Sequence, residues 1–163
     1  MSSDFYTTSI DPYAAIIIKI CRAYTHTQED FEDYYQEVCL QLFRSKENFR
    51  KEANWATWVY RVALNVCMTL FKKKKSSSKP LNPDQLPSDH SEHNQAFEDE
   101  PLELLYTAIR QLSEVDRAVI LLYLEEKSYQ EIAEIMGTNP NNIGVRINRI
   151  KERLKKILHA TVY

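Results

Sequence analysis

The stretch SYQEIAEIMGTNPNNIGVRINRIKERLKK, residues 128–156, decides how this chain folds. Both of its ends have a helical pattern, yet its middle holds Gly137, one of only two glycines, and then Asn139-Pro140. Glycine readily takes the left-handed conformation that ends a helix. Asparagine is a favoured N-cap, and proline fits the first helical position, where its missing N–H costs nothing. The sequence therefore predicts a helix that stops at Gly137 and a new helix that starts at Pro140.

A short helix, a tight turn and a second helix form the helix-turn-helix arrangement. Ala133 is small where the two helices must approach, and Arg146, Arg149 and Arg153 form a basic stripe on the second helix. A separate apolar stripe faces inward: Ile143, Ile147, Ile150, Leu154 and Ile157. Recognition helices place their first residues against base edges and their cations on phosphates. The pattern favours DNA binding over a helical hairpin of another kind.

The residues before this stretch predict further helices. Residues 102–112 have a helical pattern, and the pairs Ser113–Asp116 and Ser128–Glu131 have the spacing of a capping box, which marks helix starts. We therefore expect helices over 114–126 and 129–136.

A change in composition divides the chain. Residues 76–101 hold four prolines, many small polar residues and one basic against six acidic residues, a net charge of −5. Such a segment is typical of a flexible linker. The sequence thus predicts two small helical domains, over 1–75 and 102–163, and the scarcity of glycine and turn signals argues against a sheet.

The first piece begins with two predicted helices. Residues 11–24 predict a helix with Asp11 as its cap and Pro12 in its first turn. The second helix has an apolar face at three- and four-residue steps: Tyr34, Tyr35, Val38, Cys39, Leu42 and Phe43. Residues 28–37 hold five carboxylates and no base. Acid in the first turn suits the helix dipole, but five carboxylates exceed that need and indicate a basic partner surface.

A third helix is predicted over residues 54–75. Its apolar stripe consists of Val59, Val62, Ala63, Val66 and Leu70, and another face carries Trp55, Trp58, Arg61 and Asn65. Aromatic rings beside cations suit single-stranded DNA, because bases stack on rings while cations hold phosphates. Aromatic residues at helical spacing also serve as core, so the residues by themselves leave both interpretations open.

The charges are segregated although the net charge is −2. Residues 44–75 hold nine basic and two acidic residues, a net +7, and residues 141–158 hold six and one, a net +5. Two basic segments are compatible with binding to phosphate backbones. The alternative is a pair of solvated helix faces.

Other classes of protein are disfavoured by what the sequence lacks. No apolar run approaches the ~18 residues of a membrane span, and residues 1–13 lack a signal-peptide pattern, so we expect a cytoplasmic protein without membrane insertion. Cys21, Cys39 and Cys67 lack CxxC spacing and predict buried thiols. His90 and His93 form HxxH in a polar stretch without supporting ligands. We expect no metal, no cofactor and, without a recognisable nucleophile or phosphate loop, no enzymatic activity.

Three segments in order and spacing resemble one known family. They are EDFEDYYQEVCLQLFR (29–44), FRKEANWATWVYRVALN (49–65) and LSEVDRAVILLYLEEKSYQEIAEIMGTNPNNIGVRINRIKERLK (112–155). Together they resemble a bacterial sigma factor of the extracytoplasmic-function type. The resemblance covers nearly the whole chain outside the linker.

The resemblance implies an all-α fold of two domains, a sigma-two-like helical bundle and a sigma-four-like helix-turn-helix. It also implies core RNA polymerase and promoter DNA as partners, with an anti-sigma factor as a further candidate partner. Polymerase contacts would fall on Asp30, Asp33, Gln36 and Glu37. The linker would pass through polymerase channels.

The resemblance also assigns two DNA surfaces. Contacts to the −10 element would fall on Phe49 to Asn54, and thus on Arg50, Lys51 and Asn54, and on Trp55, Trp58, Arg61 and Asn65. It favours a mixed role for the tryptophans, with Trp58 largely packed. Contacts to the −35 element would come from Tyr129, Gln130, Asn141, Asn142, Arg146 and Arg149. Two residues depart from the family pattern: Gly144 where many relatives carry lysine, and Leu64 where a basic residue often precedes the matched Asn65.

Three other functions compete with this one. An ordinary helix-turn-helix activator would need neither the acidic helix nor the aromatic and basic segment. A helical adaptor would not need Asn139-Pro140 or the arginine stripe. A DNA breakage-and-joining enzyme would need a catalytic serine or tyrosine among arginines, and none is placed convincingly.

Overall fold

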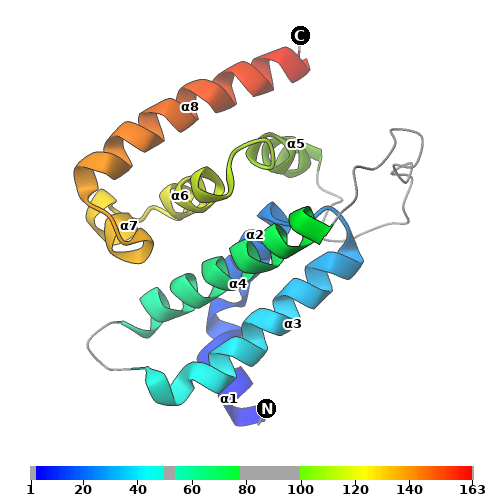
Figure 1. Ribbon diagram of the computed structural model, residues 1–163, viewed down its shortest axis with the longest axis vertical. Coiled ribbons are helices and arrows are strands. Elements are labelled where there is room, and N and C mark those ends of the chain that lie inside the picture. The colour runs from blue at the N-terminus through cyan, green and yellow to red at the C-terminus, as the bar shows by residue number, and fades with distance from the viewer. Residues whose placement is uncertain (1–2, 50–53, 78–99, 163) are drawn as a thin grey trace.

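The computed structural model describes residues 3–49, 54–77 and 100–162, and every regular element in these ranges is helical (Figure 1). The first group contains α1 (Ser3–Phe5), η1 (Tyr6–Ile10), η2 (Asp11–Tyr13), α2 (Ala14–Ala23), α3 (Gln28–Ser45), η3 (Lys46–Asn48) and α4 (Trp55–Ser77). The second group contains α5 (Glu100–Ile109), α6 (Glu114–Leu124), α7 (Tyr129–Met136) and α8 (Pro140–Val162). The all-α prediction is confirmed.

The first domain is a bundle in which α3 and α4 lie side by side and α2 packs against both (Figure 1). Thr27 caps α3, because its hydroxyl accepts a hydrogen bond from the Asp30 amide at 3.1 Å. The face predicted for α3 is confirmed, with Val38 and Leu42 fully buried. On α4, Val59, Ala63 and Val66 of the predicted stripe are buried, whereas Val62 and Leu70 are half-buried. The core face of α4 also includes residues outside the predicted stripe: Tyr60, Leu64 and Cys67.

The predicted start of the first helix is wrong. Asp11 has helical backbone angles, φ −54° and ψ −41°, and belongs to a 3₁₀ turn, η2, that leads directly into α2. An N-cap residue is typically extended. Helical backbone instead extends toward the N-terminus through η1 and α1, where Ile10 is fully buried and Phe5 packs edge-on against Phe43 at 5.5 Å.

The second domain forms around α8, which packs against α5, α6 and α7. Gly137 has φ +75° and ends α7, and its amide donates to the Ala133 carbonyl at 2.9 Å. The Asn139 side chain accepts a hydrogen bond from the Asn142 amide at 2.9 Å, and Pro140 is the first residue of α8. The predicted stop and start are therefore confirmed. Both capping serines also accept the expected amide hydrogen bonds, Ser113 at 3.2 Å and Ser128 at 3.1 Å.

The three cysteines are buried and free, as predicted. Cys21 of α2 and Cys67 of α4 lie with their sulfur atoms 3.8 Å apart in the core of the first domain. Among the described residues, no cluster of histidine, cysteine and carboxylate groups could hold a metal ion, and no helix is long and apolar enough to cross a membrane. His90 and His93 lie outside the described residues, as does most of the predicted linker, residues 78–99.

The two domains lie against one another. Helix α2 packs against α5 and α6, and α4 packs against α7 (Figure 1). This second contact brings the helix-turn-helix next to the helix that carries the predicted −10 residues.

Candidate nucleic-acid interface

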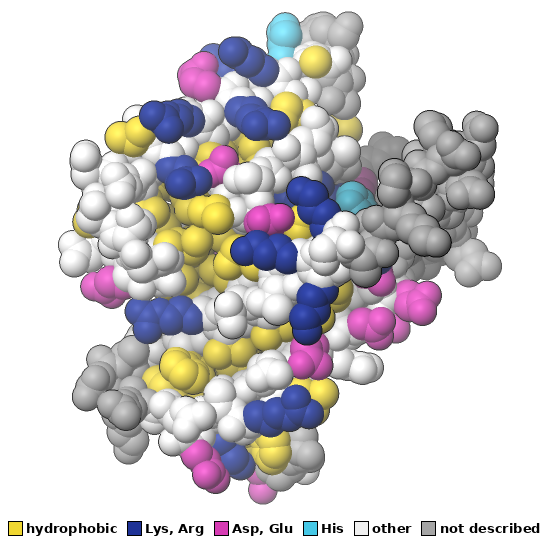
Figure 2. Space-filling view, viewed as in Figure 1, with side chains coloured by type: hydrophobic (Ala, Val, Ile, Leu, Met, Phe, Trp, Pro, Cys, Tyr) yellow, Lys and Arg dark blue, Asp and Glu magenta, His cyan; other side chains and the backbone are white. Residues whose placement is uncertain are grey.

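Helix α8 presents the predicted −35 residues on its solvent side. The inward residues Ile143, Ile147 and Ile150 are at most 2% exposed, which fixes the rotation of the helix. Asn141, Asn142, Arg146 and Arg149 are consequently exposed. Figure 2 shows Lys and Arg side chains distributed along the face formed by α8, with a group of hydrophobic side chains below them. A fixed helix with an exposed basic face can contact phosphates and base edges.

Arg146 is held in place by a residue that the sequence did not identify as part of the site. Its guanidinium Nη1 lies 2.7 Å from Oδ1 of Asp116 on α6. The sequence marked Asp116 only as the distal member of a capping box, and no local signal connects it to Arg146, 30 residues away. Arg146 and Asp116 line a cavity of about 560 Å³ between α6 and the start of α8, with Val115 and Val145 at its rim. A single surface ion pair contributes little to stability, so Arg146 can exchange it for DNA.

The Tyr129 ring of α7 lies beside Gly144 of α8. A Cβ atom built on Gly144 would lie 3.3 Å from the Tyr129 ring, so the ring occupies the space beside this glycine. Tyr129 is 40% exposed, and Gln130 beside it is also exposed. Gly144, where many relatives carry lysine, therefore has a visible role in packing, because the missing side chain leaves room for an aromatic ring from α7.

Other cations of α8 also contact the domain beneath them. Arg153 donates a hydrogen bond from Nη2 to the Gln111 carbonyl at 3.1 Å. The Lys151 ammonium lies 4.4 Å from the centre of the Tyr123 ring, and its hydrogen bond with Tyr123 raises the pKa of this lysine.

The tryptophans of α4 are half-buried. Trp55 donates its indole N–H to the Ser9 carbonyl at 2.9 Å, and Trp58 donates its own to the Ser45 hydroxyl at 3.3 Å. Phe49 packs against both rings, at centroid distances of 5.0 Å and 5.9 Å. Both tryptophans therefore have a packing role with part of each ring still accessible.

The remaining predicted −10 residues are placed differently. Arg61 and Asn65 are exposed on α4, but Arg61 also donates a hydrogen bond to the Glu134 carbonyl of α7 at 2.8 Å. Asn54 caps α4, since its side-chain oxygen accepts from the Ala56 amide at 3.1 Å. Arg50 and Lys51 lie outside the described residues.

The acidic face of α3 is partly neutralised within the chain. Asp30 forms an ion pair with Lys74 of α4, and Glu37 accepts a hydrogen bond from Gln41 at 3.0 Å. Asp33 and Gln36 are exposed. The four predicted polymerase residues thus follow one side of α3, with Asp33 and Gln36 in contact with solvent.

Two family models match the chain in the order of its two domains. The model of sigma-70 region 2 matches residues 10–77, and that of sigma-70 region 4 matches residues 102–154. This chain belongs to the sigma-70 family. The sigma-70 matches cover both helical domains and leave out most of the predicted linker.

Individual relatives place this sigma factor in the extracytoplasmic-function group. The ECF RNA polymerase sigma-E factor of Haemophilus influenzae is 29% identical over 143 residues, 79% of this chain and 75% of that protein. SigW of Bacillus subtilis is 26% identical over 95% of this chain and 89% of its own length. SigE of Mycolicibacterium smegmatis is 25% identical, and the chain spans 58% of that longer protein.

Two solved structures share the fold. The sigma factor RpoE of Bartonella quintana, in complex with the anti-sigma factor NepR, matches with a TM-score of 0.70 and 19% identity, over 97% of this chain and 98% of that one. CnrH, in complex with the cytosolic domain of CnrY, matches with a TM-score of 0.68 and 15% identity, over 98% and 90% of the two chains.

Membership of the family settles the general role. Sigma factors bind core RNA polymerase and promoter DNA and act in promoter-specific transcription initiation. They are regulatory proteins rather than enzymes.

Proposed function

We propose that this sigma factor selects promoters by reading a −35 element with α8 and a −10 element with α4 while α3 holds core RNA polymerase. The observation that carries the proposal is the fixed, exposed basic face of α8 in a helix-turn-helix, joined in one chain to an acidic α3 and an aromatic and basic α4.

At the −35 element, the start of α8 enters the major groove. Asn141 and Asn142 lie nearest the turn, and Arg146 follows one helical turn later, so these side chains meet base edges. Arg149 meets phosphate. Tyr129 and Gln130 approach the DNA from the start of α7.

At the −10 element, the proposed contacts come from Asn54, Trp55, Trp58, Arg61 and Asn65, together with Arg50 and Lys51, which precede α4 in the sequence. Separating the strands costs stacking free energy, which captured bases offset by stacking on aromatic rings. The polymerase performs the phosphodiester chemistry, and the sigma factor contributes binding.

The polymerase contact is assigned to Asp30, Asp33, Gln36 and Glu37 on α3. Lys74 competes for Asp30 in the free chain, so polymerase binding exchanges one basic partner for another. In this proposal, residues 1–75 bind polymerase and the −10 element, residues 102–163 bind the −35 element, and residues 76–101 form the linker.

An anti-sigma factor is a further proposed partner. One structural neighbour, RpoE of Bartonella quintana, is a sigma factor in complex with the anti-sigma factor NepR, and this chain has the same fold. Because RNA polymerase acts in the cytoplasm, the proposed location is cytoplasmic.

Transcription from a pool of genomic fragments by sigma-free core polymerase tests the proposal. Reactions with and without the purified full chain are compared, and new start sites are sequenced. We expect discrete starts that share −35 and −10 elements at a constant spacing. Tight binding to duplex DNA by the chain without any new start would contradict the proposal and favour an ordinary activator.

A further inference from the structure

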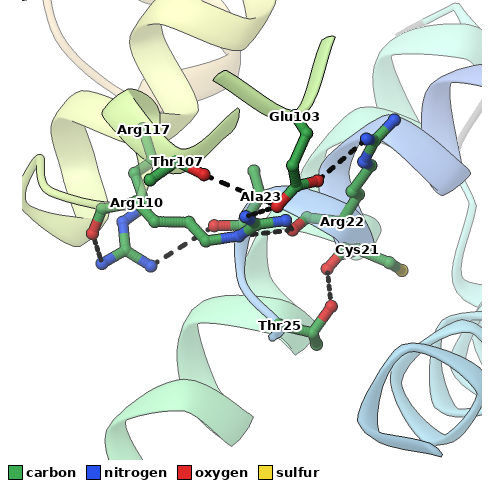
Figure 3. Close-up of polar contacts among 8 residues, drawn as sticks. All are labelled: Cys21, Arg22, Ala23, Thr25, Glu103, Thr107, Arg110 and Arg117. Atoms are coloured by element: carbon green, nitrogen blue, oxygen red, sulfur yellow. Dashed lines mark hydrogen bonds and ion pairs between the residues drawn. The ribbon is translucent and has the colours of Figure 1, made fainter. Parts of the chain in front are cut away.

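The contact between the two domains is built around four charged residues, named here the arginine junction: Arg22, Glu103, Arg110 and Arg117 (Figure 3). Arg22 lies on α2 of the first domain, and the others lie on α5, just after it and on α6 of the second. The Arg22 and Arg110 side chains are only 9% and 6% exposed. Buried guanidinium groups require partners, and the partners cross the domain boundary.

One half of the arginine junction caps a helix. Arg110 donates hydrogen bonds to the Arg22 carbonyl at 3.1 and 3.3 Å, and Arg117 donates to the Ala23 carbonyl at 3.3 Å. Both carbonyls belong to the last turn of α2, where helical carbonyls lack intrahelical partners and the helix dipole is negative. The second domain therefore supplies the C-terminal cap of a helix in the first.

The other half is an ion pair shared by both domains. The two carboxylate oxygens of Glu103 lie 3.1 Å from Arg22 Nη2 and 3.1 Å from Arg110 Nη1. A guanidinium of each domain also packs on an aromatic ring of the other. Arg22 lies 4.3 Å from the centre of the Tyr106 ring, and Arg117 lies 4.6 Å from the centre of the Phe71 ring. Glu103 is thus the carboxylate that joins Arg22 to Arg110.

Closure at the arginine junction brings α7 against α4. Trp58, Arg61 and Asn65 line a groove of about 390 Å³ whose other wall consists of Ile135 and Met136 of α7. Leu64 lines the same groove and is 2% exposed. The Arg61 hydrogen bond to Glu134 closes its edge. Part of the surface proposed for the −10 element is therefore covered by the helix-turn-helix domain.

This closed arrangement does not fit a promoter. Elements centred near −35 and −10 are about 25 base pairs apart, on the order of 85 Å at ~3.4 Å per base pair. In the closed chain, α7 of the helix-turn-helix touches α4. The two domains cannot occupy both elements until they separate.

We propose that the free chain inhibits itself: the arginine junction holds the two domains closed, and α7 masks part of the −10 surface until polymerase or DNA separates them. The inference rests on the proposed function of α4 and α8. It assigns to Glu103, Arg110 and Arg117 a regulatory role that is separate from DNA and polymerase contacts.

The composition of the arginine junction suits a contact that opens. Burial lowers the pKa of Arg110 and Arg117, with Glu103 opposing the shift at Arg110. Lowered arginine pKa values mean that burying these charges costs free energy, which hydration returns when the domains separate. Interfaces of this polar kind between domains typically permit relative motion.

Charge reversal at Glu103 tests the closed state in the full chain. Glu103→Arg removes both ion pairs and places a third guanidinium beside Arg22 and Arg110. Glu47→Arg is the matched control, because Glu47 is exposed on η3 and undergoes the same change of charge. Glu103→Gln is a milder variant in case the reversal impairs folding, and circular dichroism verifies the helical content of all three.

Small-angle X-ray scattering measures closure without reference to function. Wild type and Glu47→Arg should have a radius of gyration close to the ~15 Å of a compact chain of this length. Glu103→Arg should exceed them by several ångströms, with Glu103→Gln between. Two results would overturn the arginine junction as the closing element. In one, the wild type is as expanded as Glu103→Arg. In the other, the wild type is compact and a folded Glu103→Arg has the same radius of gyration.

Binding to a single-stranded oligonucleotide measures masking. The probe carries the −10 sequence found by start-site mapping, and it is titrated with each full-length variant in the absence of polymerase. Apparent affinity scales with the fraction of open molecules, so Glu103→Arg should bind about tenfold tighter than Glu47→Arg. An expanded Glu103→Arg with unchanged affinity would overturn masking. If mapping finds no start site, the proposed function fails, whereas the scattering result still decides whether the chain is closed.

Discussion

The two surfaces assigned to promoter DNA differ in how they are presented. On α8, an isoleucine stripe faces the core and leaves Asn141, Asn142 and Arg149 exposed. On α4, Trp58, Arg61 and Asn65 line a groove whose other wall is α7, and Arg61 is hydrogen-bonded to Glu134 although its side chain stays exposed. One surface is exposed along its helix in the free chain, whereas part of the other lies against the second domain.

This difference separates two kinds of recognition. Duplex DNA can be contacted by a helix that is already in place, so the −35 surface needs no more than the exchange of the Arg146–Asp116 ion pair for DNA. Under the proposed function, the −10 surface instead meets DNA whose strands are opening on the polymerase. If the proposed closure holds, part of the −10 surface of α4 stays against α7 until the polymerase or DNA separates the two domains.

The largest expected effect concerns the open surface. Arg146→Ala should weaken −35-dependent binding by about 1–3 kcal/mol if Arg146 contacts a base, and should relax the preference at one position. Competition footprinting of the polymerase complex on wild-type and −35-mutated promoters measures the loss. The control is Lys155→Ala near the end of α8, which should weaken binding to all sequences alike. An unchanged −35 preference in Arg146→Ala would move base reading to another residue.

A smaller effect is expected from the N-cap of α8, the helix that carries the exposed surface. Asn139→Ala removes the side-chain acceptor for the Asn142 amide and should lower the free energy of unfolding of the second domain by about 0.5–2 kcal/mol. Urea unfolding combined with hydrogen exchange at the start of α8 measures it. Asn148→Ala, on the exposed middle of α8, serves as the control and should have little effect. Equal losses in both variants would mean that the cap contributes nothing specific.

A substitution on the covered surface should act in two ways. Arg61→Ala removes the hydrogen bond to Glu134, worth about 0.5–1.5 kcal/mol, and should speed hydrogen exchange in α7 of the free chain. With polymerase, the same change should weaken −10-dependent open-complex formation. Arg61→Lys keeps the charge and separates electrostatics from hydrogen-bond geometry. Unaltered exchange in α7 would show that Arg61 does not hold the domains together.

The smallest expected effect concerns Gly144. Alanine favours a helix over glycine by about 1 kcal/mol, but its Cβ would meet the Tyr129 ring at 3.3 Å. Gly144→Ala should therefore raise the free energy of unfolding by less than this full amount. In a Tyr129→Ala background the full gain should appear, and a double-mutant cycle by urea unfolding measures the difference. Identical gains in both backgrounds would show that the ring moves aside without cost.

The sequence predicted those features whose causes are local. Gly137, Asn139 and Pro140 fix the turn through backbone chemistry within a few residues, and this prediction is confirmed. The apolar stripes of α3, α4 and α8 repeat at helical spacing, and the structure buries most of their residues. Asp11 shows the limit of a local signal, because a plausible cap became part of a longer helical segment once Ile10 and Phe5 packed into the bundle.

The arginine junction could not be predicted from the sequence, because its partners are distant. Arg22 and Glu103 are 81 residues apart, and Arg117 and Ala23 are 94 apart. Neither periodicity nor composition connects such positions. For the same reason, the helical spacing of apolar residues in α4 placed Arg61 outside the core but could not show that Arg61 contacts Glu134 of α7. The assignments of individual residues to polymerase and to DNA remain predictions.

The burial of the thiols makes the protein convenient for spectroscopy. Cys21, Cys39 and Cys67 are at most 3% exposed. Burial raises the pKa of Cys39 to about 11, and the contact with Cys21 raises that of Cys67. Reagents such as maleimides attack the accessible thiolate, so a cysteine introduced at a surface position should take up a dye while the native ones stay unmodified. Pairs of such dyes, one on each domain, would report domain separation in real time in an otherwise unaltered chain.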